Sequence, residues 1–288
     1  MGASCGRWCA YDGANSEFGD VGSSMSAEPF LTVKVRGQKS VRESILKADQ
    51  LIHEHSWITH QLVPAFYEVG RALGKGATGI VKQATRKSDG LFCAIKTVPK
   101  VNLVSVETFL REASILRKLD HPNVVKCLDT IDDGICLHAV LENCAGGDLF
   151  DWFLSLPQYT EQTVAHIIAD ITGAITHCHQ HGVVHRDIKP ENILLLRRDH
   201  GRAATVKLCD FGCAFQLNLP EGQSVTDSSV LNERQMESLM GSSYYMAPEV
   251  IAQEGRYSAA VDLWSLGVVA YLLMSGFPPF DGDSEVSC

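Results

Sequence analysis

The spacing of hydrophobic and polar positions changes part-way along the chain, and this change predicts two structural halves. Residues 66–141 contain short runs of β-branched and apolar residues separated by turn sequences such as Ser88-Asp89-Gly90, which is typical of antiparallel strands. A helical pattern over 107–119, ended by Pro122, interrupts these strands. Over 160–180 apolar residues recur every three or four positions behind Thr160, which predicts a long amphipathic helix with a threonine N-cap. We therefore expect an α+β fold with a β-rich first lobe and an α-helical second lobe.

The segment before these halves differs in composition and predicts an N-terminal extension. Residues 1–29 are rich in Gly and Ser and lack apolar periodicity, so we expect them to be disordered. Ser40 and Glu43 form a capping-box sequence at the start of a predicted helix over 40–55. The basic residues around Ser40 admit two interpretations, a pseudosubstrate segment or a helix packed on the first lobe, and we favour the helix. The predicted division is a tail at 1–29, an extension at 30–65, a first lobe at 66–142 and a second lobe at 143–288.

The composition is that of an ordinary globular protein. The chain of 288 residues is 45% hydrophobic and 20% charged, and no apolar run reaches the ~18 residues that a membrane-spanning helix needs. Its formal net charge of −9 argues against a general nucleic-acid binder, which would need a basic face. The ten cysteines include no C-x-x-C pair, so we expect reduced thiols in a cytoplasmic protein rather than disulfides or a zinc site.

Two local sequences leave alternatives open. His177, His179 and His181 could hold a metal, but they end the long predicted helix, where imidazoles interact favourably with the helix dipole, and we favour that interpretation. The first residues, M-G-A-S-C-G, nearly fit an N-myristoylation signal at Gly2, and Cys5 could take a palmitoyl chain. This start is either a doubly acylated peripheral membrane anchor or a plain disordered tail, since one acyl chain alone binds a membrane only weakly.

A polar octapeptide at 185–192, H-R-D-I-K-P-E-N, lies between two apolar segments and carries the main candidate chemistry. Asp187 could accept a proton, Lys189 could neutralise a phosphate, and Asn192 could ligate a hard metal ion through its amide oxygen. Phosphoryl transfer needs these three contributions, because its transition state depends on positioning and charge neutralisation more than on covalent chemistry. The motif resembles the catalytic loop of eukaryotic protein kinases.

Further motifs along the chain support this resemblance. Residues 74–81 read G-x-G-x-x-G-x-V and are followed by a strand pattern, where a dinucleotide-binding fold would open a helix. Lys96 then lies in an apolar strand and needs a partner, which we expect to be Glu112 on the following helix. A D-F-G sequence begins at Asp210, and an A-P-E sequence ends at Glu249.

The resemblance implies a two-lobed protein-kinase-like fold and a serine/threonine protein kinase that transfers the γ-phosphoryl group of ATP, with Mg²⁺, to protein Ser or Thr. It implies that Asp187, Lys189 and Asn192 are catalytic and that Asn192 and Asp210 hold the metal. The positions that match the nucleotide site are Leu73, Gly74, Gly76, Gly79, Val81, Ala94, Lys96, Glu112, Glu142, Cys144 and Leu194. The positions that match contacts to substrates with basic motifs are Asp148, Glu191 and Ser242, and those that match regulatory positions are Ser238 and Arg186.

Three further sequences resemble those of the calcium/calmodulin-dependent kinase group. They are Y-L-L-M-S-G-F-P-P-F at 271–280, G-S-S-Y-Y-M-A-P-E-V at 241–250 and the M-G-x-x-C start, and they are most similar to calcium-dependent protein kinases. No EF-hand loop occurs, so the sequence provides no basis for claiming calcium regulation of this chain. The sequence stops soon after the segment that contains Asp262, so we expect the second lobe to lack its last helices. The alternative to an active kinase is therefore a truncated, inactive kinase-like binding module or an incomplete gene product.

Overall fold

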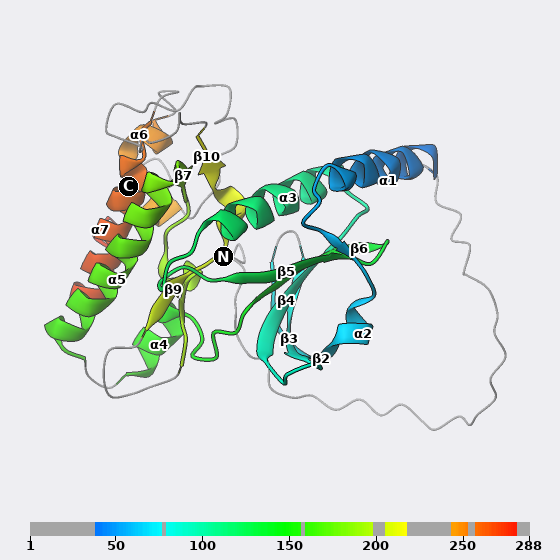
Figure 1. Cartoon of the computed structure of the whole chain (residues 1–288). Helices are drawn as coiled ribbons and strands as arrows, with labels where there is room; N and C mark the ends of the chain where they lie inside the picture. The colour runs from blue at the N-terminus through cyan, green and yellow to red at the C-terminus, as the bar shows by residue number, and fades with distance from the viewer. Residues whose placement is uncertain are drawn as a thin grey trace, which may run out of the picture.

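The computed structural model describes residues 38–76, 79–156, 159–197, 205–217, 243–252 and 257–280, which form two lobes (Figure 1). The first lobe and the segment before it contain α1 (Gln38–His53), β1 (Thr59–His60), α2 (Val63–Phe66), β2 (Tyr67–Lys75), β3 (Ile80–Arg86), β4 (Phe92–Pro99), α3 (Leu103–Lys118), β5 (Cys127–Asp132) and β6 (Cys136–Glu142). The second lobe contains α4 (Leu149–Ser155), α5 (Glu161–Gln180), β7 (Val183–Val184), β8 (Ile193–Leu195), β9 (Val206–Leu208), β10 (Phe215–Gln216), α6 (Pro248–Ile251) and α7 (Ala260–Ser275), with short 3-10 helices at Pro190–Asn192, Phe211–Cys213 and Ser243–Tyr245.

A six-stranded sheet forms the first lobe, in the order β1-β5-β6-β4-β3-β2. Its neighbouring strands are antiparallel except for β1, which pairs in parallel with β5 through Thr59 opposite Ile131. Two of the reversals between strands use glycines with positive φ, Gly90 at 73° and Gly134 at 91°, a region that glycine enters without steric cost. The strand β1 was not predicted, because two residues are too few to show an alternating pattern.

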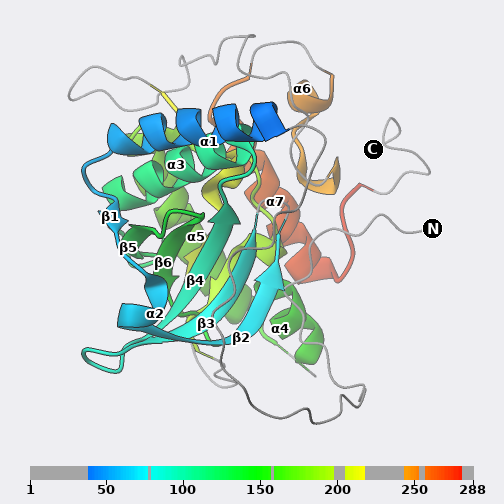
Figure 2. The same ribbon diagram turned by 90° about the vertical axis from the view of Figure 1, so that its right-hand side faces the viewer.

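The helix α3 packs against this sheet and carries Glu112 (Figure 2). Asn102 caps its first turn by accepting a hydrogen bond of 3.0 Å from the Val104 amide. Its buried positions recur at helical spacing and are Val106, Phe109, Leu110, Glu112, Ala113, Ile115 and Leu116. The helix predicted over 107–119 is therefore present, but it begins earlier, at Leu103, because the Asn102 cap defines its start.

The helix α5 supports the second lobe, as the apolar periodicity predicted. The Thr160 hydroxyl accepts a hydrogen bond of 3.2 Å from the Thr163 amide and so caps the first turn. The helix α7 contacts α5, and both enter one apolar core with β8, β9 and α3. Because this core includes Leu116 of α3 and Leu266 of α7, the two lobes share buried apolar surface.

This architecture confirms the predicted α+β fold with a β-rich first lobe and an α-helical second lobe. The helix predicted over 40–55 is present as α1, which runs over Gln38–His53. No helix within the described ranges is long and apolar enough to cross a membrane. The predicted tail at 1–29, with its candidate acylation residues Gly2 and Cys5, lies outside the described residues.

Candidate active site

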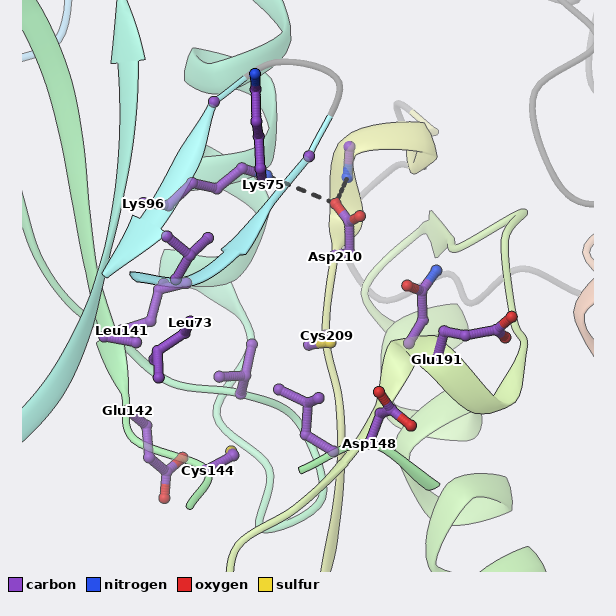
Figure 3. Close-up of a pocket in the computed structure, with 18 of the residues that line it drawn as sticks. Leu73, Lys75, Lys96, Leu141, Glu142, Cys144, Asp148, Glu191, Cys209 and Asp210 are labelled. Atoms are coloured by element: carbon purple, nitrogen blue, oxygen red, sulfur yellow. Dashed lines mark hydrogen bonds and ion pairs between the residues drawn. The ribbon is translucent and has the colours of Figure 1, made fainter. Parts of the chain in front are cut away.

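A cavity of about 490 Å³ lies where the two lobes meet (Figure 3). Its apolar walls include Leu73 and Leu141 from the first lobe and Leu194 from the second, while Glu142 and Cys144 line it at the connection between the lobes. Of the predicted nucleotide positions, those that line the cavity are Leu73, Gly76, Gly79, Val81, Ala94, Lys96, Glu112, Glu142, Cys144 and Leu194. Gly74 is not among the lining residues, and it pairs in the sheet with Val81, which is one of them.

The connection between β2 and β3 brings backbone close to the cavity. The Gly76 amide donates a hydrogen bond of 2.9 Å to the Gly79 carbonyl oxygen, which joins the two sides of the connection. A Cβ atom on Gly79 would overlap the carbonyl oxygen of Thr97 on β4, so this position requires glycine. A Cβ atom on Gly76 would meet only the Gly79 carbonyl oxygen, at 3.9 Å, which is ordinary contact.

Lys96 on β4 and Glu112 on α3 form a buried ion pair inside the cavity. The Lys96 Nζ atom lies 2.8 Å and 2.7 Å from the two carboxylate oxygens of Glu112, and the two side chains are 15% and 8% exposed. Burial lowers the pKa of Lys96, but Glu112 and Asp210 raise it by more, so the ammonium group stays charged. Burial raises the pKa of Glu112, and the neighbouring Lys96 opposes that rise. The pairing predicted from the sequence is therefore confirmed.

Asp210 follows β9 and lies beside the same ammonium group. Its Oδ1 atom is 3.5 Å from the Lys96 Nζ atom and accepts a hydrogen bond of 3.4 Å from the Gly212 amide. The Asp210 backbone is left-handed, with φ 57° and ψ 75°, a conformation that is costly for a non-glycine residue and is concentrated at functional sites. Burial raises the pKa of this carboxyl, but its polar neighbours, led by the Lys96 charge and including the Gly212 amide, lower it below its ordinary value, so Asp210 is a carboxylate near neutral pH.

Phe211 and His185 join the segment after β9 to the loop after β7. Phe211 is fully buried, and its ring meets the His185 ring edge-on with 4.7 Å between centroids. The Nδ1 atom of His185 accepts a hydrogen bond of 3.3 Å from the Asp187 amide, while Nε2 lies 3.0 Å from the Cys209 carbonyl oxygen. Because an amide N–H donates and a carbonyl accepts, these two partners assign the imidazole proton to Nε2.

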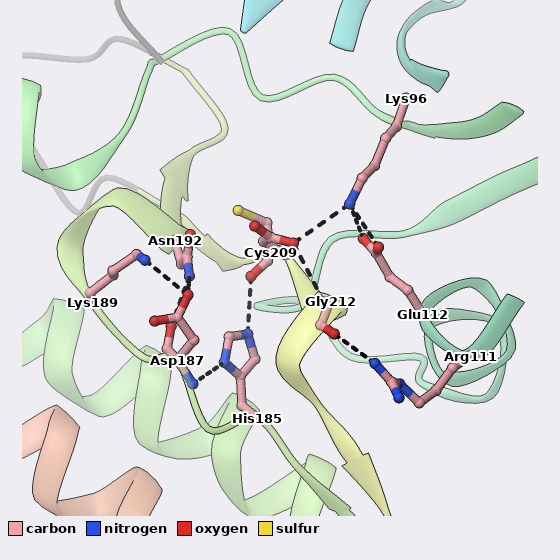
Figure 4. Close-up of polar contacts among 10 residues, drawn as sticks. Lys96, Arg111, Glu112, His185, Asp187, Lys189, Asn192, Cys209 and Gly212 are labelled. Carbon is pink, nitrogen blue, oxygen red and sulfur yellow. Dashed lines mark hydrogen bonds and ion pairs between the residues drawn. The ribbon is translucent and has the colours of Figure 1, made fainter. Parts of the chain in front are cut away.

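Asp187, Lys189 and Asn192 form one hydrogen-bonded group on this loop (Figure 4). The Oδ2 atom of Asp187 lies 2.9 Å from the Lys189 Nζ atom and accepts a hydrogen bond of 2.9 Å from the Asn192 side-chain amide. The same amide nitrogen donates to the Asp187 carbonyl oxygen at 2.8 Å. Since both bonds use Nδ2 of Asn192, its Oδ1 atom is the group available to a metal ion. The three predicted catalytic residues thus lie together in the cavity that also contains Asp210.

A buried carboxylate on α7 holds the backbone of this loop. Asp262 is 1% exposed, and its oxygens accept hydrogen bonds from the amides of Arg186 at 2.8 Å and His185 at 2.9 Å. The Nε2 atom of His179, at the end of α5, lies 2.8 Å from the same carboxylate. The His179 contact could not be predicted from the sequence, because the two residues are 83 positions apart. The loop is therefore fixed by helices α5 and α7 through one side chain.

The predicted regulatory residue Arg186 contacts the segment that follows Asp210. Its guanidinium donates to the Cys213 carbonyl oxygen at 2.7 Å and to the Tyr257 hydroxyl at 3.2 Å, and it lies over the Phe215 ring, 5.6 Å from the centroid. Its predicted phosphate partner Ser238 and the predicted substrate residue Ser242 lie outside the described residues.

Two carboxylates line the cavity on the side of the second lobe. Asp148 is 4% exposed and caps α4 by accepting a hydrogen bond of 2.7 Å from the Asp151 amide. Burial, followed by the charges of Asp151 and Glu191, raises the pKa of Asp148. Glu191 follows Pro190, and its Oε2 atom is buried without a hydrogen-bond partner among the described residues. A buried carboxylate oxygen without a donor is costly, and a cationic ligand would satisfy it.

Comparison with known proteins gives the family of the chain. Residues 67–287 match the protein kinase domain. The chain belongs to the protein kinase domain family. Calcium-dependent protein kinase 5 of Plasmodium berghei is 34% identical to it over 237 residues, which are 82% of this chain and 39% of that protein. Calcium-dependent protein kinase 7 of Oryza sativa subsp. japonica is 40% identical over 223 residues, which are 76% of this chain and 38% of that protein.

A probable myosin light chain kinase of Dictyostelium discoideum is also similar, with 36% identity over 222 residues, or 76% of this chain and 53% of that protein. The chain thus spans from 38% to 53% of the length of these curated relatives. The family match and the calcium-dependent relatives confirm the resemblance that the catalytic-loop sequence indicated.

The protein kinase family generally uses ATP and Mg²⁺, and the cavity of this protein kinase domain fits both. The Asp210 carboxylate and the Asn192 amide oxygen are the hard donors that Mg²⁺ prefers, and Mg²⁺ usually takes one or two protein ligands together with substrate phosphates. Lys96 adds a charged ammonium group beside them, and the apolar walls suit an aromatic base. Within the described ranges, the cavity included, no group of three or more His, Cys, Asp or Glu side chains is placed to hold a metal ion.

Cysteines line the cavity, and histidines stand at the end of α5. Burial raises the pKa of Cys144 to about 12 and also raises that of Cys209, so both are neutral thiols with weak nucleophilic character. The His181 ring lies 2.8 Å from the carbonyl oxygen of His177 at the end of α5. This contact with a terminal carbonyl confirms the interpretation of the histidines as helix-end residues.

Proposed function

We propose that this protein kinase domain is a serine/threonine kinase that transfers the γ-phosphoryl group of ATP, with Mg²⁺, to hydroxyl groups of protein substrates. The observation that carries the proposal is the convergence of Lys96, Glu112, Asp187, Asn192 and Asp210 on one cavity. These residues come from β4, α3, the loop after β7 and the end of β9. Phosphoryl transfer requires such convergence, because the protein contributes mainly position and charge.

Each charged group has a separate task in the proposed reaction. Lys96, oriented by Glu112, binds phosphate oxygens of the nucleotide. Asp210 and Asn192 hold Mg²⁺, which neutralises phosphate charge when it is bound. Asp187 orients the substrate hydroxyl and accepts its proton, and Lys189, 2.9 Å from Asp187, adds positive charge beside the transferred group.

The proposed substrates are protein segments with a Ser or Thr and a nearby Arg. The K-P-E-N sequence that starts at Lys189 is typical of Ser/Thr kinases, which favours these two hydroxyls over that of Tyr. Asp148 and Glu191 supply two carboxylates at the same cavity, and one buried oxygen of Glu191 has no donor among the described residues. A guanidinium group pairs well with carboxylates because it offers a fixed fork of N–H donors.

Radiolabel transfer from ATP to a basic serine peptide tests this proposal. Asp187→Asn keeps the size of the side chain and removes the proton acceptor, so the transfer rate should fall by about 10²–10⁴-fold. Asp120→Asn is the matched control, because this carboxylate is 84% exposed and lies outside the cavity, and its rate should equal that of wild type. Equal rates for wild type and Asp187→Asn would exclude the proposed mechanism.

Thermal unfolding with and without Mg-ATP separates the alternatives. A wild-type chain that is stabilised by nucleotide but transfers no phosphate would be an inactive kinase-like binding module. A chain with no cooperative unfolding transition would be an incomplete product that does not fold alone.

A further inference from the structure

The segment before the first lobe packs against α3, the helix that carries Glu112. Figure 2 shows α1 alongside α3, and the second half of α1 places Ala48 and Ile52 in the contact, where they are 0% and 1% exposed. The apolar cluster that they enter includes four residues of α3: Val106, Phe109, Leu110 and Ala113. Since Ala113 directly follows Glu112, the packing of α1 reaches the turn of α3 that forms the Lys96 pair.

An ion-pair cluster around the buried Lys100 ties α1 to the same region, although the Asp49 side chain itself is 42% exposed. Lys100 is 3% exposed, and its Nζ atom lies 2.9 Å from Asp49 of α1 and 2.9 Å from Asp132 of β5. Lys100 stands between β4, which carries Lys96, and α3, which carries Glu112. Asp49 therefore attaches α1 where β4 is connected to α3. The relative position of β4 and α3 sets the distance between Lys96 and Glu112.

A second attachment holds the segment after α1. The Trp57 ring lies under the Arg117 guanidinium at the end of α3, 5.1 Å from the centroid. Two residues later the chain joins the sheet as β1, and the Thr59 hydroxyl donates to the Thr130 carbonyl oxygen at 3.1 Å. The segment is thus held at three places: by the packing of α1, by Trp57 and by β1. We call residues 38–60 the brace, because they contact α3 along its length.

We infer that residues 38–60 position α3 so that Glu112 reaches Lys96, and that Asp49 is a positioning residue for phosphoryl transfer. The inference rests on the proposed kinase function, and it gives the contacts of the extension with α3 a positioning role without contact to the cavity. If α3 moved away by even a few ångströms, the 2.7 Å contact of Glu112 with Lys96 would be lost. Lys96 would then have only Asp210, 3.5 Å away, as a carboxylate partner.

The test compares two substitutions at Asp49. Asp49→Asn removes the charge that links α1 to Lys100, but Lys100 keeps Asp132 at 2.9 Å, so no buried cation is left unpaired. We expect kcat to fall roughly three- to tenfold, within the range of coupling energies for residues distant from a ligand. The KM for the peptide substrate should not change. Asp49→Glu, which keeps the charge, should restore most of the rate.

A second pair of variants tests the packing. Ala48→Arg places a charge in the buried contact with α3, whereas Gln50→Arg places the same charge two residues away on an exposed position of α1. Ala48→Arg should lower kcat and speed amide hydrogen exchange over residues 103–118, and Gln50→Arg should do neither. A wild-type kcat for Asp49→Asn and Ala48→Arg, in chains that still unfold cooperatively, would overturn the inference.

Hydrogen exchange can be measured without kinase activity, so it tests the positioning of α3 independently of the proposed function. If the wild-type chain transfers no phosphate, the proposed function fails, and the positioning of α3 is judged by exchange alone. Faster exchange over residues 103–118 in Ala48→Arg than in Gln50→Arg then supports the brace, and equal exchange in the two variants overturns it.

Discussion

Lys96 and Glu112 in the cavity have lost most of their contact with water, so each controls the energy of the other. Lys96 and Glu112 are 15% and 8% exposed, whereas the surface pair Lys126 and Asp120, 3.0 Å apart, is 60% and 84% exposed. Water and salt screen an exposed pair, so it contributes ~0–1 kcal/mol. Removing one partner of a buried pair leaves the other charge without compensation. The molecule thus contains its own comparison between a buried and an exposed ion pair.

Replacing Lys96 by Met should abolish phosphoryl transfer and destabilise the fold, because Glu112 would stay buried without its cation. We expect the free energy of unfolding to fall by about 2–4 kcal/mol, somewhat below the full cost of an unpaired buried charge because Glu112 can take up a proton. Lys126→Met should cost less than ~1 kcal/mol. Urea unfolding at neutral pH measures both values. Equal losses in the two variants would show that burial does not determine the strength of the Lys96 pair.

Replacing Glu191 by Gln should weaken the binding of arginine-containing substrates selectively. The buried Oε2 atom of Glu191 has no donor among the described residues, so a substrate guanidinium is the partner that it would gain. We expect the KM for a peptide with Arg near its Ser to rise about tenfold, the size of one lost hydrogen bond to a charged group. The KM for the same peptide with Ala in place of Arg should not change. An equal rise for both peptides would argue for a general distortion of the loop.

The preference for arginine should also depend on pH, through Asp148. Its pKa is raised by burial and by neighbouring carboxylates, and only its ionised form attracts a cation. The preference should therefore be complete above the raised pKa of Asp148 and weaken as the pH falls through it. The ratio of kcat/KM for the two peptides, measured from neutral to acid pH, gives the direction.

At the level of helices and strands, elements with a strong local period were predictable and long-range contacts were not. The strand with Lys96 and the helix with Glu112 each show their own hydrophobic pattern, so their pairing followed from the need of a buried Lys for a carboxylate. The contact of Asp49 with Lys100 joins residues 51 positions apart, and nothing local to either residue marks it. Gly74, also predicted for the nucleotide site, lies in the sheet opposite Val81, a residue that lines the cavity.

Gly79 fixes how closely β3 follows β4, and its substitution should show this. A Cβ atom there would overlap the Thr97 carbonyl oxygen, while one on Gly76 would have its nearest atom at 3.9 Å. Without nucleotide, Gly79→Ala should therefore lower the free energy of unfolding by about 1–3 kcal/mol, as overpacking does. Gly76→Ala should leave the melting temperature near that of wild type. A similar melting temperature for both variants would mean that β3 shifts without cost.

Asp262 shows how one helix determines the geometry of the catalytic loop. It accepts hydrogen bonds from the amides of His185 and Arg186, and the φ of Arg186 is 66°, a conformation that needs support from its surroundings. Asp262→Asn turns one acceptor oxygen into an NH₂ group, which faces a donor. We expect a loss of about 1–3 kcal/mol in stability together with a lower kcat.

Two measurements show whether Asp262→Asn lowers kcat by displacing the catalytic loop or by weakening the fold in general. The KM for ATP should stay near the wild-type value, since Lys96 and Asp210 do not contact Asp262 directly, while kcat falls with the displaced Asp187. Ser265→Ala, which removes a hydroxyl on the same helix that contacts the Tyr245 carbonyl oxygen at 2.7 Å, is the control for a general weakening of α7. An equal effect of both variants on kcat would assign the loss to α7 as a whole.

At the scale of the whole molecule, the cavity and the shared core connect the two lobes by different means. The core joins them permanently, because it contains buried residues of α3 as well as of α5 and α7. The cavity adds a connection that depends on ligand, because Lys96 belongs to the first lobe and Asp210 and Asn192 to the second. A bound nucleotide with Mg²⁺ would contact both sets of residues, so its binding energy should oppose unfolding of the entire chain.

This coupling predicts how magnesium and nucleotide act together on stability. At about 100 times its dissociation constant, Mg-ATP should stabilise the wild-type chain by about 2.7 kcal/mol, and ATP with a chelator should stabilise it less. Asp210→Asn should fold normally, because its carboxylate is 43% exposed, but Mg²⁺ should add less to its stabilisation by ATP than it adds for wild type, since the charged ligand is gone. Thermal unfolding under the four combinations of nucleotide and metal measures both effects. A full response of Asp210→Asn to Mg²⁺ would mean that the metal is held by other residues, and the assignment of Asp210 as its ligand would then be wrong.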